Sequence, residues 1–90
     1  MVRIKRIVLD VLKPHQPNGL DFAASIAESL EGGRVHLSVN AVDEHTETVM
    51  IDISCEGLQY DNVVEVISSM GGSVHSIDEV EVESLTSGCD

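Results

Sequence analysis

Aromatic side chains are almost absent from this 90-residue chain, in which Phe22 and Tyr60 are the two examples. The core must therefore be built from aliphatic side chains, and a chain of this length suffices for one domain with a modest core. No apolar run approaches the roughly 20 residues that a membrane-spanning helix needs, and the first residues show no signal-peptide pattern. We therefore expect a cytoplasmic protein that does not bind membranes.

Cysteines and basic residues are scarce too. Cys55 and Cys89 fit no spacing typical of metal or redox sites, so free thiols in a reducing cytoplasm are expected. Sixteen acidic residues stand against five basic ones, for a formal net charge of −11. Such a surface repels nucleic acid and anionic membranes, so neither is an expected partner. The acidity either serves solubility or favours cation binding.

The first half of the chain predicts a strand, a helix and a second strand. Ile7–Leu12 is the most apolar stretch and predicts a central strand within Val2–Leu12, which Pro14 ends. Asn18 is a typical N-cap for a helix from Leu20 to about Leu30, and a glycine pair follows that helix.

The remaining elements are a strand hairpin, a helix and a last strand. Val35–Ala41 and Val49–Cys55 alternate apolar and polar residues, which predicts the hairpin. Tyr60–Met70 has apolar residues at helical spacing. Val74–Glu83 predicts a last strand, with a β-bulge where its alternation slips after Ile77.

The order βαββαβ predicts an α+β, ferredoxin-like fold, which is a four-stranded antiparallel sheet with two helices on one face. Residues 1–83 are expected to form a single ferredoxin-like domain, and residues 84–90 a flexible tail. Right-handed crossovers place the first strand between the third and the fourth. The end of the first strand then lies beside the starts of the third and fourth strands.

Histidines and acids gather at this rim of the predicted sheet. His15, His45 and His75 reach it together with acids of the hairpin turn, including Glu44, and further acids lie down the central strands. Histidine with carboxylate suits a divalent metal, and carboxylates alone suit calcium or magnesium. The predicted metal ligands are Asp10, His15, Asp43, Glu47, His75 and Asp78. The sequence has no metal-binding motif, so the alternative is that these histidines are solvated or bind backbone groups.

The opposite rim and the far face of the sheet carry two further expectations. Antiparallel pairing of the first and last strands predicts ion pairs between the basic group Arg3, Lys5 and Arg6 and the acidic group Glu79, Glu81 and Glu83. The face without helices is expected to be partly apolar, which favours association with another copy of the chain. Its candidate residues are Val8, Leu12, Val42, Met50 and Ile77.

Two segments, Ile4–His15 and Gly71–Val80, and the pair Thr46-Glu47 resemble a family of small archaeal proteins known only as a domain of unknown function. The resemblance covers residues 3–83 and implies a ferredoxin-like fold, an archaeal cytoplasmic setting and homo-oligomers such as rings, with no established activity. Family members commonly have an acid where this chain has Gln16, so a site that needs a carboxylate at that position is in doubt here.

On sequence alone we favour a non-enzymatic, self-assembling module that binds a small ligand or a divalent cation at the acid/histidine rim or at a subunit interface. A purely structural homo-oligomer is the first alternative. A small metal-dependent hydrolase or isomerase with His15 or His75 as general base is the least favoured hypothesis.

Overall fold

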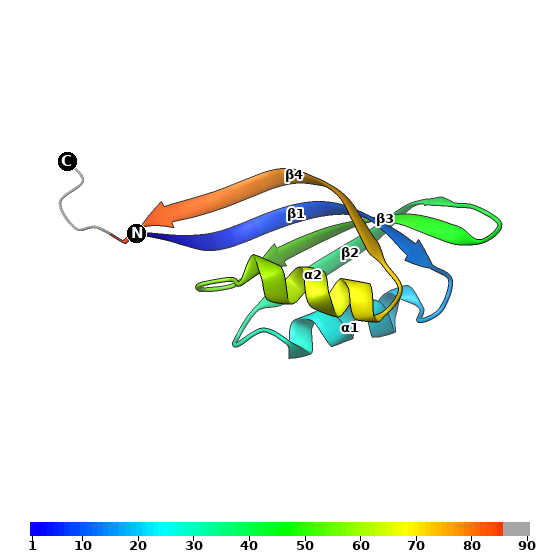
Figure 1. The fold of residues 1–90 in the computed structure, drawn as a ribbon, viewed down its shortest axis with the longest axis horizontal. Coiled ribbons are helices and arrows are strands. Elements are labelled where there is room, and N and C mark those ends of the chain that lie inside the picture. Colours follow the sequence, from blue (N-terminus) through cyan, green and yellow to red (C-terminus); the bar gives the residue numbers. More distant parts are fainter. Residues whose placement is uncertain (86–90) are drawn as a thin grey trace.

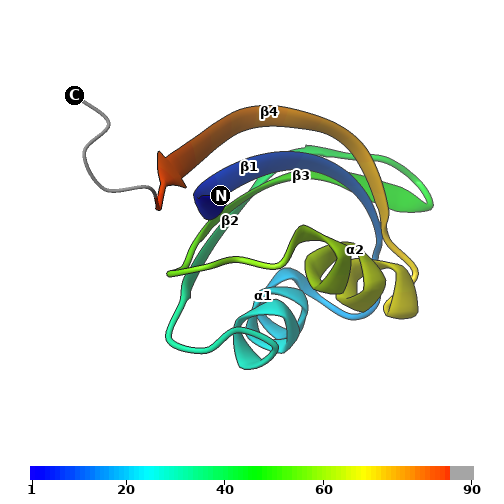
Figure 2. The same cartoon turned by 60° about the vertical axis from the view of Figure 1, so that its left-hand side comes forward.

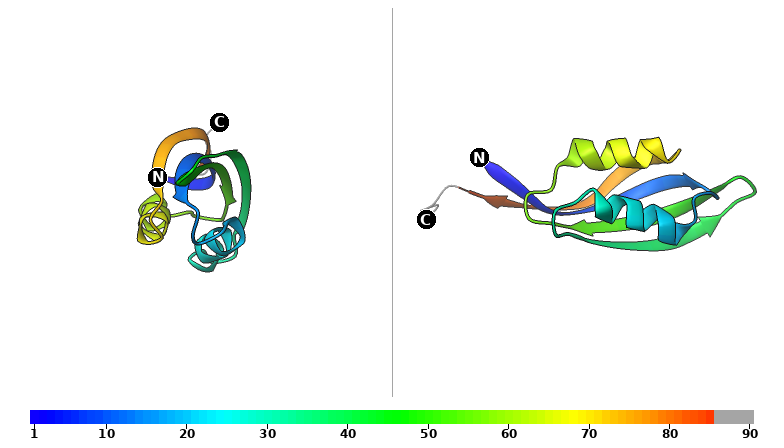
Figure 3. Two further views of the ribbon diagram at one scale, coloured as in Figure 1. Left: turned by 90° about the vertical axis from the view of Figure 1, so that its right-hand side faces the viewer. Right: turned by 90° about the horizontal axis from the view of Figure 1, so that it is seen from below.

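The computed structural model describes residues 1–85 and has the predicted ferredoxin-like α+β fold (Figure 1). Its elements are β1 (Val2–Pro14), α1 (Gly19–Glu28), β2 (Arg34–Val42), β3 (Thr46–Ser54), α2 (Tyr60–Ser69) and β4 (Ser73–Ser84). Both helices lie on one face of the sheet (Figure 3). Ser84, which the sequence assigned to a flexible tail, still belongs to β4, and residues 86–90 lie outside the described residues.

The four strands form one antiparallel sheet in the order β2-β3-β1-β4, so β1 is central as predicted. β1 pairs with β3 from Arg6 onward but with β4 from Val2 onward. The start of β1 and the end of β4 therefore project past the helices as a two-stranded ribbon (Figure 1). The sheet curves around the helices, which leaves its other face convex and uncovered by them (Figure 2). We call this the open face.

The pairing of β1 with β4 is interrupted by three shifts in register. One of them skips Asp78 between the pairs Val8–Glu79 and Leu9–Ile77, which confirms the bulge predicted after Ile77. Another skips His75, on the same strand. Bulges turn individual side chains away from the regular alternation of a strand, and here they act on two of the candidate site residues.

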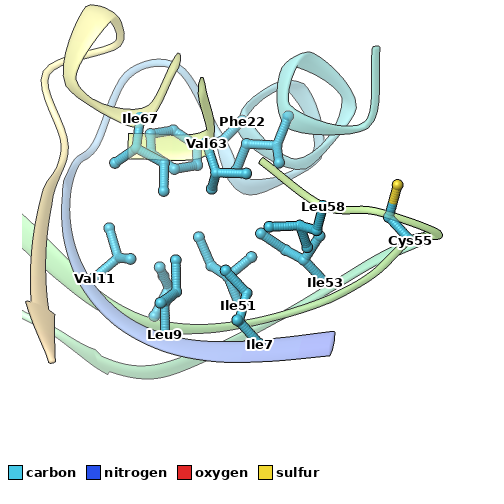
Figure 4. Close-up of a cluster of buried hydrophobic side chains, with 12 residues drawn as sticks. Ile7, Leu9, Val11, Phe22, Ile51, Ile53, Cys55, Leu58, Val63 and Ile67 are labelled. Carbon is cyan, nitrogen blue, oxygen red and sulfur yellow. The ribbon is translucent and has the colours of Figure 1, made fainter. Parts of the chain in front are cut away.

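The core fills the space between the sheet and the helices (Figure 4). Alternate residues of β1 and β3 face the helices and are almost fully buried, and they pack against Phe22, Ile26, Val63 and Ile67 of the helices. The core residues on the two strands are Ile7, Leu9, Val11, Val49, Ile51 and Ile53. This aliphatic core with one central phenylalanine is what the composition requires.

Local signals in the sequence set the helix ends. The Asn18 side chain accepts a hydrogen bond of 2.8 Å from the backbone N–H of Asp21, which confirms the predicted N-cap of α1. After α2, Gly71 adopts a φ of +85°, and the N–H of Gly72 donates to the Ile67 carbonyl. Gly72 lies so close to Phe22 and Ile67 that a Cβ atom would meet their side chains at 2.9 and 2.8 Å.

The prediction for the open face was right for Val8, Leu12 and Met50 and wrong for two residues. Val42 pairs with Glu47, which is in phase with the core residue Val49, and Ile77 pairs with the core residue Leu9. Paired residues share a face, so both lie on the helix side of the sheet. The physical reason is the bulges, which shift the alternation of β2 at Asn40 and of β4 at Asp78.

Two smaller findings concern the expectations drawn from composition. Cys55 is a buried free thiol, and Cys89 lies outside the described residues. Among residues 1–85, neither helix has the length and apolar character that crossing a membrane requires.

Candidate functional site

A hollow of about 360 Å³ opens on the open face of the sheet, and its lining comes from the three strands β1, β3 and β4. We call it the Asp10 hollow; it is lined by Asp10, Leu12, Thr48 and His75. Leu12 and Thr48 are direct cross-strand partners, and Asp10 is two residues before Leu12 on the same face of β1. Regular strand pairing therefore places three of the four lining residues.

His75 reaches the hollow through a break in that regular pairing. Asp10 pairs with Ser76 and Val11 pairs with Val74, so His75 is the extra residue of β4 at this step. Without the bulge, alternation would place His75 on the opposite face from Ser76. The bulge thus accounts for an imidazole beside a carboxylate in the middle of the sheet.

Asp10 is the unusual residue of this site. Its Oδ1 atom is shielded from solvent and has no hydrogen-bond partner among the described residues. A buried carboxylate oxygen without a partner is destabilising, and such groups in native proteins call for an explanation. A basic side chain of the same protein is the usual partner of a buried carboxylate, so we ask where the five basic residues lie.

Four of the five basic residues are engaged elsewhere. Arg3 binds Glu56, Lys5 binds Glu56 and Glu83, Arg6 binds Asp52 and Glu79, and Lys13 binds Glu47. The predicted ion pairs between β1 and β4 thus form for Glu79 and Glu83. Within residues 1–85, neither Arg34 nor Glu81 has an ion pair. Within the described residues, no basic side chain forms an ion pair with Asp10.

Asp78 does not join the hollow. It is the bulged residue of β4, and its Oδ1 accepts a hydrogen bond of 2.7 Å from the Ser76 hydroxyl. This contact is local to β4, and Asp78 is exposed to solvent.

A second group of candidate residues lies at the end of β1, and we call it the Glu47 cluster (Lys13, His15 and Glu47). Lys13 follows Ile7, Leu9 and Val11 in the alternation of β1, so its side chain is fully buried, with Nζ 5.7 Å from the centre of the Phe22 ring. Nζ donates to Glu47 Oε1 at 3.0 Å and to the Pro14 carbonyl at 2.8 Å. These contacts leave the lysine at the edge of the core with acceptors for its charge.

His15 completes the Glu47 cluster. Its Nδ1 lies 3.0 Å from Glu47 Oε2, and its Nε2 lies 3.0 Å from the carbonyl oxygen of Glu44. Both partners are acceptors, so both ring nitrogens donate in the protonated imidazolium. The carboxylate of Glu47 and then the Glu44 carbonyl raise the pKa of His15, while His15 and then Lys13 lower the pKa of Glu47. The cluster ties the β2–β3 turn to the loop after β1, and both Glu47 oxygens already have partners.

The remaining rim residues are simple turn residues. The backbone N–H of Asp43 donates to the Thr46 carbonyl at 2.8 Å, which closes the hairpin turn. His45 lies 3.2 Å from Glu44, and both side chains are exposed.

The six predicted ligands thus occupy four places in one chain: Asp10 and His75 share the hollow, His15 and Glu47 share the cluster, and Asp43 and Asp78 lie apart. Among residues 1–85, no three His, Cys, Asp or Glu side chains are positioned to hold a metal ion. Sequence reasoning missed Thr48 and Lys13. The regular alternation of β1 and β3 was the signal that could have found both.

The fold and the site define a small ferredoxin-like α+β protein with an acid/imidazole hollow on the open face of its sheet. The chain belongs to the DUF211 family, described as "Uncharacterized ArCR", whose model matches residues 5–85. It is 43% identical over 77 residues to "Uncharacterized protein MJ0319" of Methanocaldococcus jannaschii, covering 86% of this chain and 79% of that protein. The resemblance to an archaeal family of unknown function is thereby confirmed. Neither description names an activity.

Proposed function

We propose that this protein is a self-assembling module whose copies join edge to edge and whose open face binds a small cationic ligand. The observation that carries the assembly is a match between the two edges of the sheet. Within the described residues, β2 and the part of β4 before Ser84 each have a neighbouring strand on one side alone, so their outer sides are sheet edges. Within one sheet β4 runs in the opposite direction to β2. When two copies lie side by side in the same orientation, β4 of one copy can therefore pair antiparallel with β2 of the next.

The apolar residues of the two edges fit this pairing. On the helix side, rows of paired residues cross the whole sheet, and each row ends in an apolar residue at both edges. If the rows continue into the next copy, three apolar pairs form between β4 and β2: Val80 with Val35, Ile77 with Leu37, and Val74 with Val39. Val80, Ile77 and Val39 are 60%, 48% and 50% exposed in the single chain, so this contact would remove them from water.

The charges of the two edges support the same register. On the open face, one row runs Glu81–Arg6–Ser54–Arg34 and the next runs Glu79–Val8–Asp52–His36. Continuing these rows would bring Glu81 opposite Arg34 of the next copy, and Glu79 opposite its His36. In the described part of the chain Arg34 is the one Lys or Arg without an ion pair, and Glu81 is one of several acids without one. Opposite charges across strands stabilise the pairing and oppose other registers.

Two different edges that meet in this way make a head-to-tail interface. Such an interface forms a closed ring when its rotation closes, and a filament when it does not. The curvature of the sheet in Figure 2 favours closure. The ligand part of the proposal is supported by Asp10, which lines the hollow and has a shielded carboxylate oxygen without a hydrogen-bond partner among residues 1–85.

The test of the assembly is a charge reversal at the proposed interface. Sedimentation velocity should give a discrete oligomer for the wild type, a smaller species for Arg34→Glu and for Glu81→Arg, and the oligomer again for the double variant. Glu65→Arg on the exposed surface of α2 changes the net charge as Glu81→Arg does and should assemble normally. A monomeric wild type, or single variants that assemble like the wild type, would refute the edge pairing.

A purely structural oligomer is the second candidate, and it is supported by the same edges. It predicts normal assembly and no binding of any cation beyond ionic-strength effects.

A further inference from the structure

We infer that the Asp10 hollow binds a primary alkylammonium group, as found in small aliphatic amines. This inference deepens the ligand-binding part of the proposed function and rests on it. The polar groups that line the hollow are the Asp10 carboxylate, the Thr48 hydroxyl and the His75 imidazole, and they come from three different strands. A carboxylate is an acceptor alone, and a hydroxyl and a neutral imidazole can each accept one hydrogen bond or more. The hollow therefore offers three acceptors.

An ammonium group matches this set in number and charge. It carries one positive charge and three N–H donors, one for each acceptor of the hollow. A charge-assisted hydrogen bond to Asp10 would also satisfy the oxygen that has no partner among the described residues. The carboxylate torsion of aspartate is soft, so a ligand can recruit the shielded oxygen by a small rotation of the side chain. The net charge of −11 favours cations over anions.

Divalent metal ions match the hollow less well. Calcium takes six to eight oxygen ligands and magnesium a near-ideal octahedron, whereas the hollow has one carboxylate and one hydroxyl. Transition metals suit imidazole and carboxylate together, but no third His, Cys, Asp or Glu within residues 1–85 is placed to complete such a site. Asp78, the nearest further acid along β4, is hydrogen-bonded to Ser76.

The shape of the hollow fits an alkyl chain behind the ammonium group. Leu12 forms the apolar part of the lining and is 44% exposed, so a short alkyl chain can cover it. The volume of about 360 Å³ lies at the lower end of the range for small-molecule sites, roughly 300–1,000 Å³. We therefore expect a small aliphatic amine.

The experiment is calorimetric titration of the full-length protein in cacodylate buffer, which contains no amine and does not precipitate divalent ions. The probes are butylammonium, butan-1-ol as the uncharged analogue, tetramethylammonium as a cation without N–H donors, and magnesium and manganese as divalent ions. Butylammonium should bind, and the alcohol and tetramethylammonium should not. Asp10→Asn should weaken butylammonium at least about tenfold, because the charge-assisted bond is lost. Thr48→Val should weaken it several-fold, and Asp78→Asn, a matched control on the adjacent strand, should leave it unchanged.

Each other outcome overturns the inference in a recognisable way. Equal binding of tetramethylammonium would show that charge alone is recognised. Magnesium or manganese binding that requires both Asp10 and Asp78, with no binding of butylammonium, would replace the amine by a metal and leave a cation site in place. If no probe binds, the ligand site itself is refuted, and sedimentation of the same samples shows separately whether assembly holds. Circular dichroism of Asp10→Asn and Thr48→Val establishes that both variants are folded.

Discussion

Replacing Asp10 with valine should make the fold more stable, although aspartate lies in the middle of the central strand. Its Oδ1 atom is shielded from solvent and unpartnered among the described residues, and its cross-strand partner on β3 is the apolar Met50. Val8 and Met50, which flank it on the open face, are buried and half-buried. Valine is close to aspartate in volume and favours strand geometry.

The expected gain can be estimated from these contacts. A buried polar group without a partner costs about 1–3 kcal/mol, and one of the two carboxylate oxygens is affected here, so the lower end applies. Valine also has a higher strand propensity than aspartate, and this adds less than about 1 kcal/mol, the full span of the propensity scale. A total of about 1–2 kcal/mol follows, which in a domain of this size corresponds to a rise in Tm of roughly 4–15 °C.

The assay is urea and thermal unfolding at one fixed protomer concentration, because assembly also shifts apparent stability. Asp52→Val is the matched control: Asp52 lies on the neighbouring strand and the same face, but both its oxygens accept hydrogen bonds from Arg6, at 3.0 and 2.8 Å. That substitution should destabilise the fold. If Asp10→Val is neutral or destabilising, the carboxylate is satisfied in solution, and the argument that it awaits a ligand fails.

Three further predictions concern the remaining parts of the fold. The pKa of His15 is raised in the folded state, so its contribution to stability is complete below about pH 6.5 and is lost as the pH rises through the raised value. The urea midpoint should therefore fall over that pH interval, and it should fall less in His15→Gln. Gly72→Ala should destabilise by about 1–3 kcal/mol in urea unfolding, because its Cβ would overlap Phe22, whereas Gly19→Ala, with its nearest contact at 3.4 Å, should not. Ile51→Ala should cost about 2–5 kcal/mol by the same assay, because it leaves a cavity in a fully buried part of the core.

Most of the fold followed from patterns that are local in the sequence. The alternation of Val35–Ala41 and Val49–Cys55, the N-cap Asn18 and the glycines after each helix predicted the elements, and the general handedness of crossovers predicted their order. These signals work because each depends on a few neighbouring residues. The phase of β4 was less accessible, because its bulges depend on how β4 pairs with β1, and this pairing is not a property of either segment alone.

The candidate site was predictable to the same limited degree. The topology places Asp10 and His75 on neighbouring strands, but their meeting in the hollow depends on the bulge at His75, which the sequence does not specify. The sequence also does not specify which acids have cationic partners. Glu47 is bound by Lys13 and His15, and this could be recognised once Lys13 was seen to lie in phase with the core. Asp10 stands out in the sequence itself, because it is a charge inside an apolar central strand and such a charge needs a partner.

The shortage of basic residues connects the two halves of the proposed function. With sixteen acids and five bases, internal ion pairs cannot neutralise every acid, and four of the bases are already engaged. Glu81 and Asp10 then differ in what they can recruit, because Glu81 lies on an edge strand that a second copy can reach, whereas Asp10 lies on the central strand. In the proposed assembly the positive charge for Glu81 comes from Arg34 of a neighbour, and in the proposed ligand site the positive charge for Asp10 comes from a molecule small enough to enter the hollow. Added salt should therefore weaken assembly more than it weakens ligand binding, because exposed edge charges are screened more strongly than a partly buried one.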